Sequence, residues 1–294
     1  MKRSYLSIIS ALSVCAGAAV FPPGAGASTQ PHVTIRVFAS DAIEQPLRQI
    51  GYVFEKEHPN AKLHYEFSAS GVFYTAIVQG VPPDIFISSG SKYQNKLSGR
   101  SSINLPSTVG YDYLAVATPC RNPVQDASAP SVTESNVVQS MLGSNVRLAM
   151  ADPELSPAGA RAMKMFAKIS ATHRGAVRAM LARSRQVLSP AEALNLVENG
   201  KADMGIVYAS QITGRKKMGA CIGGAMIPKK YNSRAEFTIS ILKKSKFHFV
   251  SANRRTLDRD YRDFVLSDKG QKILGEWGFV PASGGNRGFL AKFF

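Results

Sequence analysis

Short apolar runs alternate along the chain with segments whose apolar residues recur at helical spacing. Runs rich in β-branched or aromatic residues predict strands at 33–38, 63–67, 84–87, 114–118, 146–150, 204–208 and 237–242. Several of these runs are continuously apolar, which is typical of parallel strands covered on both faces. The spacing of Leu47, Ile50 and Phe54 predicts a helix, and a second helical pattern begins at Leu257. This alternation predicts an α/β protein with mostly parallel sheets.

Two stretches break the alternation. Residues 119–135 combine prolines, serines and alanines without periodicity, and residues 218–232 combine glycines with Pro228 and a basic pair. Such compositions predict loops and turns rather than helices or strands.

The N-terminal residues have the features of a secretory signal peptide. Lys2 and Arg3 precede an apolar stretch at 6–20, and an Ala-Gly-Ala sequence at 25–27 suits signal peptidase. The sequence LSVC at 12–15 is a poor lipoprotein signal because Val14 is bulky. We therefore expect residues 1–27 to be removed on export, with the mature chain starting at Ser28.

The chain is strongly basic, with a formal net charge of +16. A field of this sign attracts anions and raises their rate of encounter with the protein. The same net charge is also consistent with a solvated basic surface, or with loose binding to anionic lipid or nucleic acid. Charge alone does not choose between these alternatives.

Two cysteines remain after the leader, which contains Cys15. In an oxidising compartment, Cys120 and Cys221 can form one disulfide, and this is our prediction. The alternative is two separately buried thiols, since sequence separation does not show how close the backbones come.

Several segments have the features of helix starts. Ser156-Pro157 and Ser189-Pro190 each place a capping serine before a proline at the first helical position, and Ser70 follows a predicted strand. Unpaired N–H groups and the positive dipole end make a helix start attractive to anions. Each of these serines can equally serve only as a cap.

The order and spacing of these pieces resemble the periplasmic molybdate-binding proteins, within the larger type-2 periplasmic binding fold. The likeness runs from about Val33 to Phe279. It is carried by TIRVFAS at 34–40, FSASG at 67–71 with GVPPDIFIS at 80–88, ADPELSPAG at 151–159, and LVE at 196–198 with GIVY at 205–208. The Asp-Pro-Glu…Pro-Ala-Gly and Gly-Ile-Val-Tyr pieces together make the resemblance fairly specific.

The resemblance implies two α/β lobes that close on a ligand in the cleft between them by hinge motion. We expect residues 28–112 and 236–294 to form lobe I, and residues 113–235 to form lobe II. It further implies a monomeric solute-binding component of an ABC importer, without cofactor, that passes a small oxyanion such as molybdate or tungstate to a membrane permease.

The family holds its oxyanion with serine hydroxyls, backbone N–H groups and one tyrosine hydroxyl. Ser70, the Ala158 amide and Tyr208 match three of those positions. The fourth lies at the turn containing Ser40 and Ala42, and we include both as candidate ligand-binding residues.

Two positions depart from the family pattern. Ala42, preceded by Asp41, aligns with a serine donor, and Pro190 aligns where the family uses a backbone N–H. Each loss removes a hydrogen bond worth roughly 1.5–3 kcal/mol to a charged oxygen. Asp41 would also repel a dianion if it faced the cleft. These departures favour weakened molybdate binding or a different ligand.

Other classes of function have less support. The chain contains no Gly-x-Ser-x-Gly, His-Glu-x-x-His, Cys-x-x-Cys or P-loop motif, so we expect no enzymatic activity. Phe73 and Tyr74 could line a pocket for a small organic anion, although one of them is expected in the core. The basic residues form short pairs rather than a stripe, which disfavours specific nucleic-acid binding.

Overall fold

The computed structural model describes residues 32–120, 132–243 and 252–282. The expected signal peptide at 1–27 lies outside these ranges. None of the helices described combines the length and the apolar character that crossing a membrane requires.

The first sheet is built from both ends of the chain. Its strands follow the order β11-β4-β10-β3-β1-β2. They are β1 (Val33–Ser40), β2 (Ala61–Ser68), β3 (Ile85–Ser88), β4 (Ser107–Asp112), β10 (Ala235–Ile241) and β11 (Val280–Pro281). β1 is parallel to β2 and β3, whereas β10 is antiparallel to β3 and β4.

The second sheet comes from the middle of the chain, in the order β7-β6-β8-β5-β9. Its strands are β5 (Leu114–Pro119), β6 (Leu148–Ala151), β7 (Arg185–Val187), β8 (Met204–Tyr208) and β9 (Ile222–Met226). β6 is parallel to β7 and β8, and β5 is antiparallel to β8 and β9. The chain thus leaves the first sheet after β4 and returns to it at β10.

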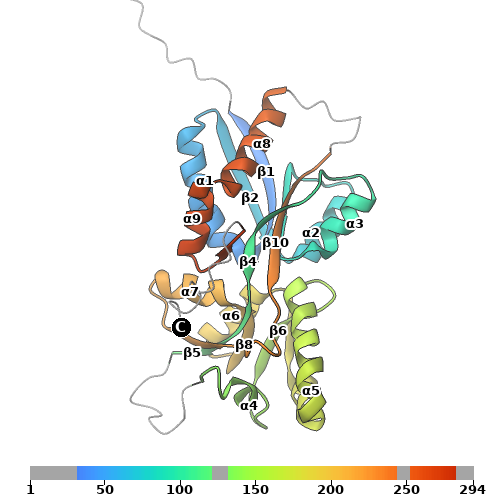
Figure 1. The fold of residues 1–294 in the computed structure, drawn as a ribbon, viewed down its shortest axis with the longest axis vertical. Helices are drawn as coiled ribbons and strands as arrows, with labels where there is room; N and C mark the ends of the chain where they lie inside the picture. The colour runs from blue at the N-terminus through green and yellow to red at the C-terminus, as the bar shows by residue number, and fades with distance from the viewer. Residues whose placement is uncertain (1–31, 121–131, 244–251, 283–294) are drawn as a thin grey trace, which may run out of the picture. The chain divides into compact units, whose positions relative to one another are not determined.

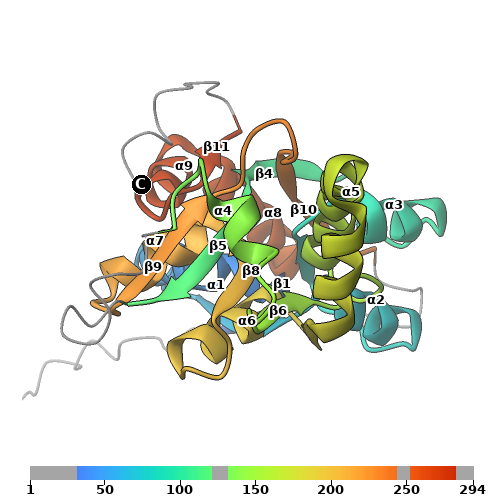
Figure 2. The same ribbon diagram turned by 90° about the horizontal axis from the view of Figure 1, so that it is seen from below.

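Helices cover both faces of each sheet (Figures 1 and 2). Those around the first sheet are α1 (Glu44–Glu57), α8 (Ala252–Leu266) and α9 (Asp268–Glu276) on one side, and α2 (Ser70–Val78) and α3 (Ser91–Gly99) on the other. Those around the second are α4 (Val137–Met141), α5 (Pro157–Arg183), α6 (Pro190–Glu198) and α7 (Ala209–Lys217). A short 3-10 helix, η1 (Asp41–Ile43), joins β1 to α1.

Alternation along β1 explains why both faces are covered. Ile35 and Val37 pack with Leu47, Ile50 and Phe54 of α1 in one buried cluster. Phe38 points to the opposite face, where its ring stacks on that of Phe73 at a centroid distance of 4.4 Å. Phe73 is therefore a core residue, which leaves only Tyr74 of the two aromatics half-buried.

The α/β class predicted from the sequence is confirmed, and each predicted strand is present. The sheets are mixed rather than mostly parallel, because β5 and β10, which follow the crossovers between sheets, run against their neighbours. Four strands were not predicted, namely β4, β7, β9 and β11. The expected limits of the two lobes, at 112/113 and 235/236, stay a prediction.

A disulfide links two adjacent strands of the second sheet. Cys120 directly follows β5, Cys221 directly precedes β9, and their Cα atoms are 5.1 Å apart. Pro119 and Ile222 beside them are paired in the sheet. The bond therefore joins strand ends that the sheet already holds side by side.

Candidate functional site

In both sheets, the candidate residues lie at or just after the carboxyl ends of parallel strands. In the first sheet, β2, β1 and β3 end side by side at Ser68, Ser40 and Ser88. In the second, β7, β6 and β8 end at Val187, Ala151 and Tyr208. Such edges are where α/β proteins gather ligands, because helix starts converge there.

The two edges are in direct contact. The Gly71 N–H at the start of α2 donates to the Leu155 carbonyl at 2.9 Å, and the Tyr93 hydroxyl donates to the Glu154 carbonyl. A Cβ on Gly71 would lie 2.5 Å from that Leu155 oxygen, so only glycine allows this approach. These contacts describe a closed arrangement of the loops.

Ser70 and Tyr208 form hydrogen bonds with the backbone N–H and the carbonyl of one residue, Ser89. The Ser89 N–H donates to Ser70 Oγ at 3.3 Å, and Tyr208 Oη donates to the Ser89 carbonyl at 3.3 Å. Both side chains are fully buried. The structure thus brings together two of the hydroxyls that the sequence singled out.

Ala158 lies beside the same turn. It is the second residue of α5, where N–H groups have no partner within the helix. A Cβ on Gly90 would lie 3.1 Å from Pro157 Cβ, so the start of α5 packs against the residue that follows Ser89. Ser70, Ala158 and Tyr208 are therefore grouped around residues 89–90.

Burial raises the pKa of the Tyr208 phenol to about 12, more than offsetting the lowering effect of Arg161 nearby. The phenol therefore stays neutral at physiological pH and acts as a hydrogen-bond donor. Its ring is fixed by an edge contact to Phe237 at a centroid distance of 5.2 Å. A rigid, neutral donor suits a buried oxyanion, because little entropy is lost when it binds.

Ser40 is the last residue of the middle strand β1, and Ala42 follows it in η1. Both are buried, and the Ser40 hydroxyl makes no capping bond to η1. Ala42 lines a pocket of about 60 Å³ that Ser70, Ala158 and Tyr208 do not line. The structure therefore places Ala42 at one side of the group rather than within it.

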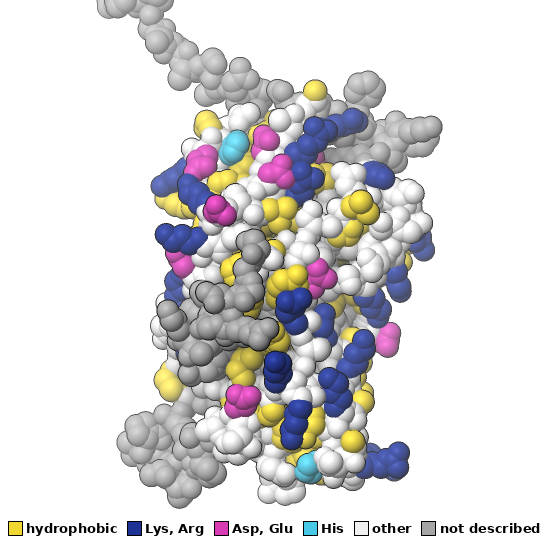
Figure 3. Space-filling model, in the orientation of Figure 1, with side chains coloured by type: hydrophobic (Ala, Val, Ile, Leu, Met, Phe, Trp, Pro, Cys, Tyr) yellow, Lys and Arg dark blue, Asp and Glu magenta, His cyan; other side chains and the backbone are white. Residues whose placement is uncertain are grey.

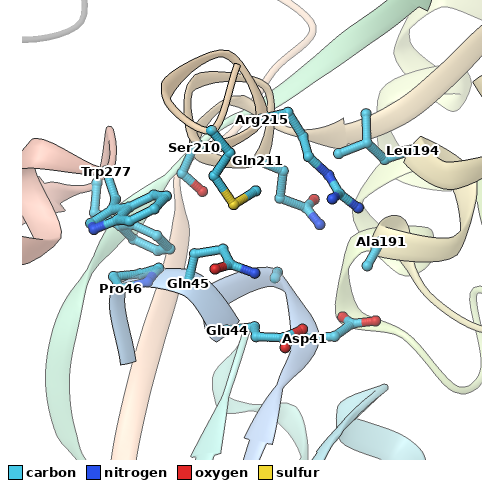
Figure 4. Close-up of a pocket in the computed structure, with 14 residues that line it drawn as sticks. Asp41, Glu44, Gln45, Pro46, Ala191, Leu194, Ser210, Gln211, Arg215 and Trp277 are labelled. Atoms are coloured by element: carbon cyan, nitrogen blue, oxygen red, sulfur yellow. The ribbon is translucent and has the colours of Figure 1, made fainter. Parts of the chain in front are cut away.

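This pocket lies where η1 and α1 face α6 and α7. Figure 4 shows Asp41 and Glu44 along one wall and Ser210, Gln211 and Arg215 of α7 along the opposite wall. The guanidinium of Arg215 is held by Glu198 at 3.3 Å and by Asn195 at 2.7 Å. Its charge is thus largely compensated within the second lobe.

Asp41 is the acidic residue of this pocket whose pKa is shifted by burial. Burial raises the pKa of its carboxyl to about 6, the Ser189 hydroxyl lowers that pKa, and the charge of Glu44 raises it further. Ser189 caps α6 and accepts the Glu192 N–H at 3.3 Å. The Glu192 carboxylate in turn accepts the Leu188 N–H at 2.9 Å.

The first crossover between the sheets carries a second buried acid, Asp112. Its carboxylate accepts the Tyr113 N–H at 2.7 Å and the Ser210 N–H at 3.3 Å. Burial raises the pKa of Asp112 to about 7, and hydrogen bonds from Ser210 limit the rise. This residue ties the end of β4 to the start of α7.

Sequence reasoning did not single out Ser89 or Arg161. Arg161 lies one turn into α5 and donates from Nη1 to the Arg234 carbonyl at 2.9 Å. Its Nε is buried and has no hydrogen-bond partner among the described residues. Both residues depend on segments distant in sequence, although an arginine three positions after Ala158 could have been noted as a cationic donor.

The surrounding surface is basic. The exposed side of α5 carries Lys164, Lys168, Arg174 and Arg178, and the helix contains no Asp or Glu. Figure 3 shows Lys and Arg side chains gathered where Figure 1 places this helix. The described residues include no group of three or more His, Cys, Asp or Glu able to hold a metal.

Comparison with known proteins agrees with this architecture. Residues 35–280 match the family model described as bacterial extracellular solute-binding protein. The molybdate-binding protein ModA of Escherichia coli is 27% identical over 275 residues, covering 92% of this chain and 97% of the relative. That of Haemophilus influenzae is 25% identical over 260 residues, covering 87% and 93%.

Solved structures show the same type-2 periplasmic binding fold. The periplasmic molybdate-binding protein of Azotobacter vinelandii aligns with a TM-score of 0.68 at 19% identity, over 84% of this chain and 98% of that one. The sulfate-binding protein SubI of Mycobacterium tuberculosis aligns with a TM-score of 0.70 at 15% identity, over 89% and 90%. With the match over residues 35–280, these findings show that the chain belongs to the family of bacterial extracellular solute-binding proteins, which are non-enzymatic components of transporters.

Proposed function

We propose that this protein captures a small tetrahedral oxyanion between its two lobes in the periplasm and delivers it to the permease of an ABC importer. The observation that carries the proposal is the grouping of Ser70, Ala158 and Tyr208 around residues 89–90. The relatives named for molybdate and sulfate support an anion of this size and shape.

The chemistry of the group suits such a ligand. Ser70 Oγ and Tyr208 Oη are neutral donors, and the start of α5 adds an N–H group and the positive end of a helix dipole. In the closed arrangement the Tyr208 hydroxyl donates to the Ser89 carbonyl, whereas Ser70 Oγ accepts the Ser89 N–H. An oxyanion would therefore replace the Ser89 carbonyl as the acceptor of the Tyr208 hydroxyl. A small opening of the two edges would free the Tyr208 hydroxyl, because Ser89 follows a strand of the first sheet and Tyr208 ends a strand of the second.

A panel of oxyanions and small carboxylates in a thermal-shift assay tests the proposal. A ligand that binds only the folded state raises the melting temperature with its concentration. Ser70→Ala and Tyr208→Phe should each weaken binding of that ligand by about 0.5–3 kcal/mol, the range for one hydrogen bond to a neutral or charged group.

Matched controls are available on the same protein. Tyr52→Phe removes a hydroxyl from an exposed tyrosine, and Ser98→Ala removes one from a half-buried serine of α3, so neither should change affinity. Unchanged affinity in both Ser70→Ala and Tyr208→Phe would contradict the site. Binding that falls steeply with salt would instead indicate a polyanion-binding surface.

A further inference from the structure

Four basic residues of α5 form an exposed face that has no acidic partners. The helix has 27 residues and contains no Asp or Glu. None of the four forms an ion pair with a residue that the structure describes. We call this set the α5 basic face, and it consists of Lys164, Lys168, Arg174 and Arg178. These residues stand apart in the sequence, because helical spacing separates side chains that share a face.

The four cations lie on one side of α5, although the helix is kinked. His173 has a φ of −135° and a ψ of 40°, which are not helical. Phe166 and Ile169 before this kink, and Val177 and Met180 after it, belong to one buried cluster. The exposed cations of both halves therefore face away from the same core. At a rise of about 1.5 Å per residue, the face is about 20 Å long.

Exposed cations elsewhere on the protein do have acidic partners. Arg147 donates to both oxygens of the Asp203 carboxylate, at 2.6 and 3.0 Å, and Lys62 pairs with Glu55 at 3.0 Å. On the α5 basic face, cations one helical turn apart repel one another, because salt screens charges only beyond about 8 Å. A dense array of negative charges opposite the face would offset that repulsion.

Short or apolar residues lie among these cations. Ala167, Ala171 and Ala179 are exposed, and Met163 beside the face is 36% exposed. Short side chains let a flat surface approach the helix, and the aliphatic stems of Lys and Arg add apolar contact below their charged ends. Apart from one histidine, the only aromatic side chain of α5 is that of Phe166, which is buried, so the face has no platform for stacking nucleic-acid bases. Positive charge combined with exposed apolar atoms favours the headgroup region of a lipid bilayer.

We propose that the α5 basic face docks the protein on a lipid bilayer that contains anionic phospholipids. The lipid phosphates accept hydrogen bonds from the ammonium and guanidinium groups. Each Lys or Arg near such a membrane strengthens binding by about fivefold, so four together contribute on the order of several hundredfold. Ser70 and Tyr208 are buried and take no part in the face, so docking does not depend on the proposed oxyanion site. Attachment of this kind concentrates a transporter component beside a membrane.

Co-sedimentation of the purified protein with lipid vesicles tests the proposal. At about 100 mM salt, vesicles of phosphatidylcholine with about 30% phosphatidylglycerol should bind the protein at least about tenfold more tightly than vesicles of phosphatidylcholine alone. Raising the salt to about 500 mM should release the protein. A quadruple variant of the face should bind the anionic vesicles about a hundredfold more weakly. Because glutamine keeps a helix propensity close to that of lysine and arginine, the variant combines Lys164→Gln, Lys168→Gln, Arg174→Gln and Arg178→Gln.

A second quadruple variant with the same net charge is the matched control. It replaces by glutamine four exposed cations of other segments, namely Arg100, Lys201, Lys229 and Lys230. Its binding to the anionic vesicles should differ from that of the wild type by less than about fivefold. Equal weakening in both quadruple variants would assign the effect to net charge alone and overturn the proposal.

Two further outcomes overturn the proposal. One is a wild-type protein that does not bind the anionic vesicles at about 100 mM salt. The other is tighter binding to DNA than to these vesicles, lost in the α5 variant, which would assign the face to nucleic acid. If the α5 variant does not fold, Lys164→Gln and Arg178→Gln singly should each weaken vesicle binding about threefold or more, and no change in either overturns the proposal.

Discussion

Replacing Cys120 and Cys221 together by serine is expected to lower the free energy of unfolding by about 2–4 kcal/mol. The disulfide joins positions 101 residues apart, so breaking it returns to the unfolded chain the freedom of a long loop. Because Pro119 and Ile222 are paired beside it, the folded sheet should change little. Urea denaturation of the oxidised wild type and the double variant measures the difference.

The reduced wild-type protein is the control for this experiment. It should unfold at the same denaturant concentration as the double serine variant, since both lack the cross-link. Two reactive thiols in denatured, non-reduced protein would contradict the bond, as would equal stability of the oxidised protein and the variant.

Gly159→Ala is expected to destabilise the protein by about 3 kcal/mol, the upper end of the range for overpacking a buried position. A Cβ at this position would lie 2.2 Å from the Ala151 carbonyl oxygen and 2.6 Å from the Asp152 carbonyl carbon. Both obstacles are backbone atoms, so the start of α5 would have to move away from β6. That movement would also displace the neighbouring Ala158 N–H, and ligand affinity should fall with stability.

Gly175→Ala in the same helix is the matched control. Apart from its chain neighbours and the backbone of its own helical turns, no described atom lies within 4 Å of the Cβ that this substitution adds. Alanine is favoured over glycine within a helix by about 0.5–1 kcal/mol, so this variant should be slightly more stable than the wild type. Thermal and urea denaturation of both variants measures the effects, and equal stability of the two would contradict the steric argument.

The strands that sequence patterns predicted are those rich in β-branched or aromatic residues. β9 was missed because Gly223 and Gly224 give it the composition of a turn. Their actual role is close packing, since a Cβ on Gly223 would lie 2.6 Å from Thr118 Oγ1 and one on Gly224 would lie 2.6 Å from the Val116 carbonyl. Glycines in a sequence can therefore indicate either a turn or a closely packed strand, and only the position of the neighbouring strand distinguishes the two.

Only those candidate site residues whose positions depend on local turns could be predicted from the sequence. Ser70, Ala158 and Tyr208 each follow a strand or begin a helix, so their positions depend mainly on nearby sequence. Ser89 and Arg161 acquire their roles from partners in distant segments, at Tyr208 and Arg234. The sequence identified Asp41 as a departure from the family, but its burial and its contact with Ser189 depend on a segment distant in sequence.

The return of the chain to the first sheet has a consequence for the order of folding. Thr238 of β10 pairs with Ser88 of β3, so closing this contact requires ordering a very long loop. All strands of the second sheet lie between Leu114 and Met226 and need no residue from either end of the chain. We therefore expect β5 and β8 to gain protection before β10 in pulse-labelled hydrogen exchange during refolding, and the reverse order would contradict this. During synthesis, the second sheet would then fold first. The first sheet, although β1–β4 are made earlier, would be completed only after β10 has been made.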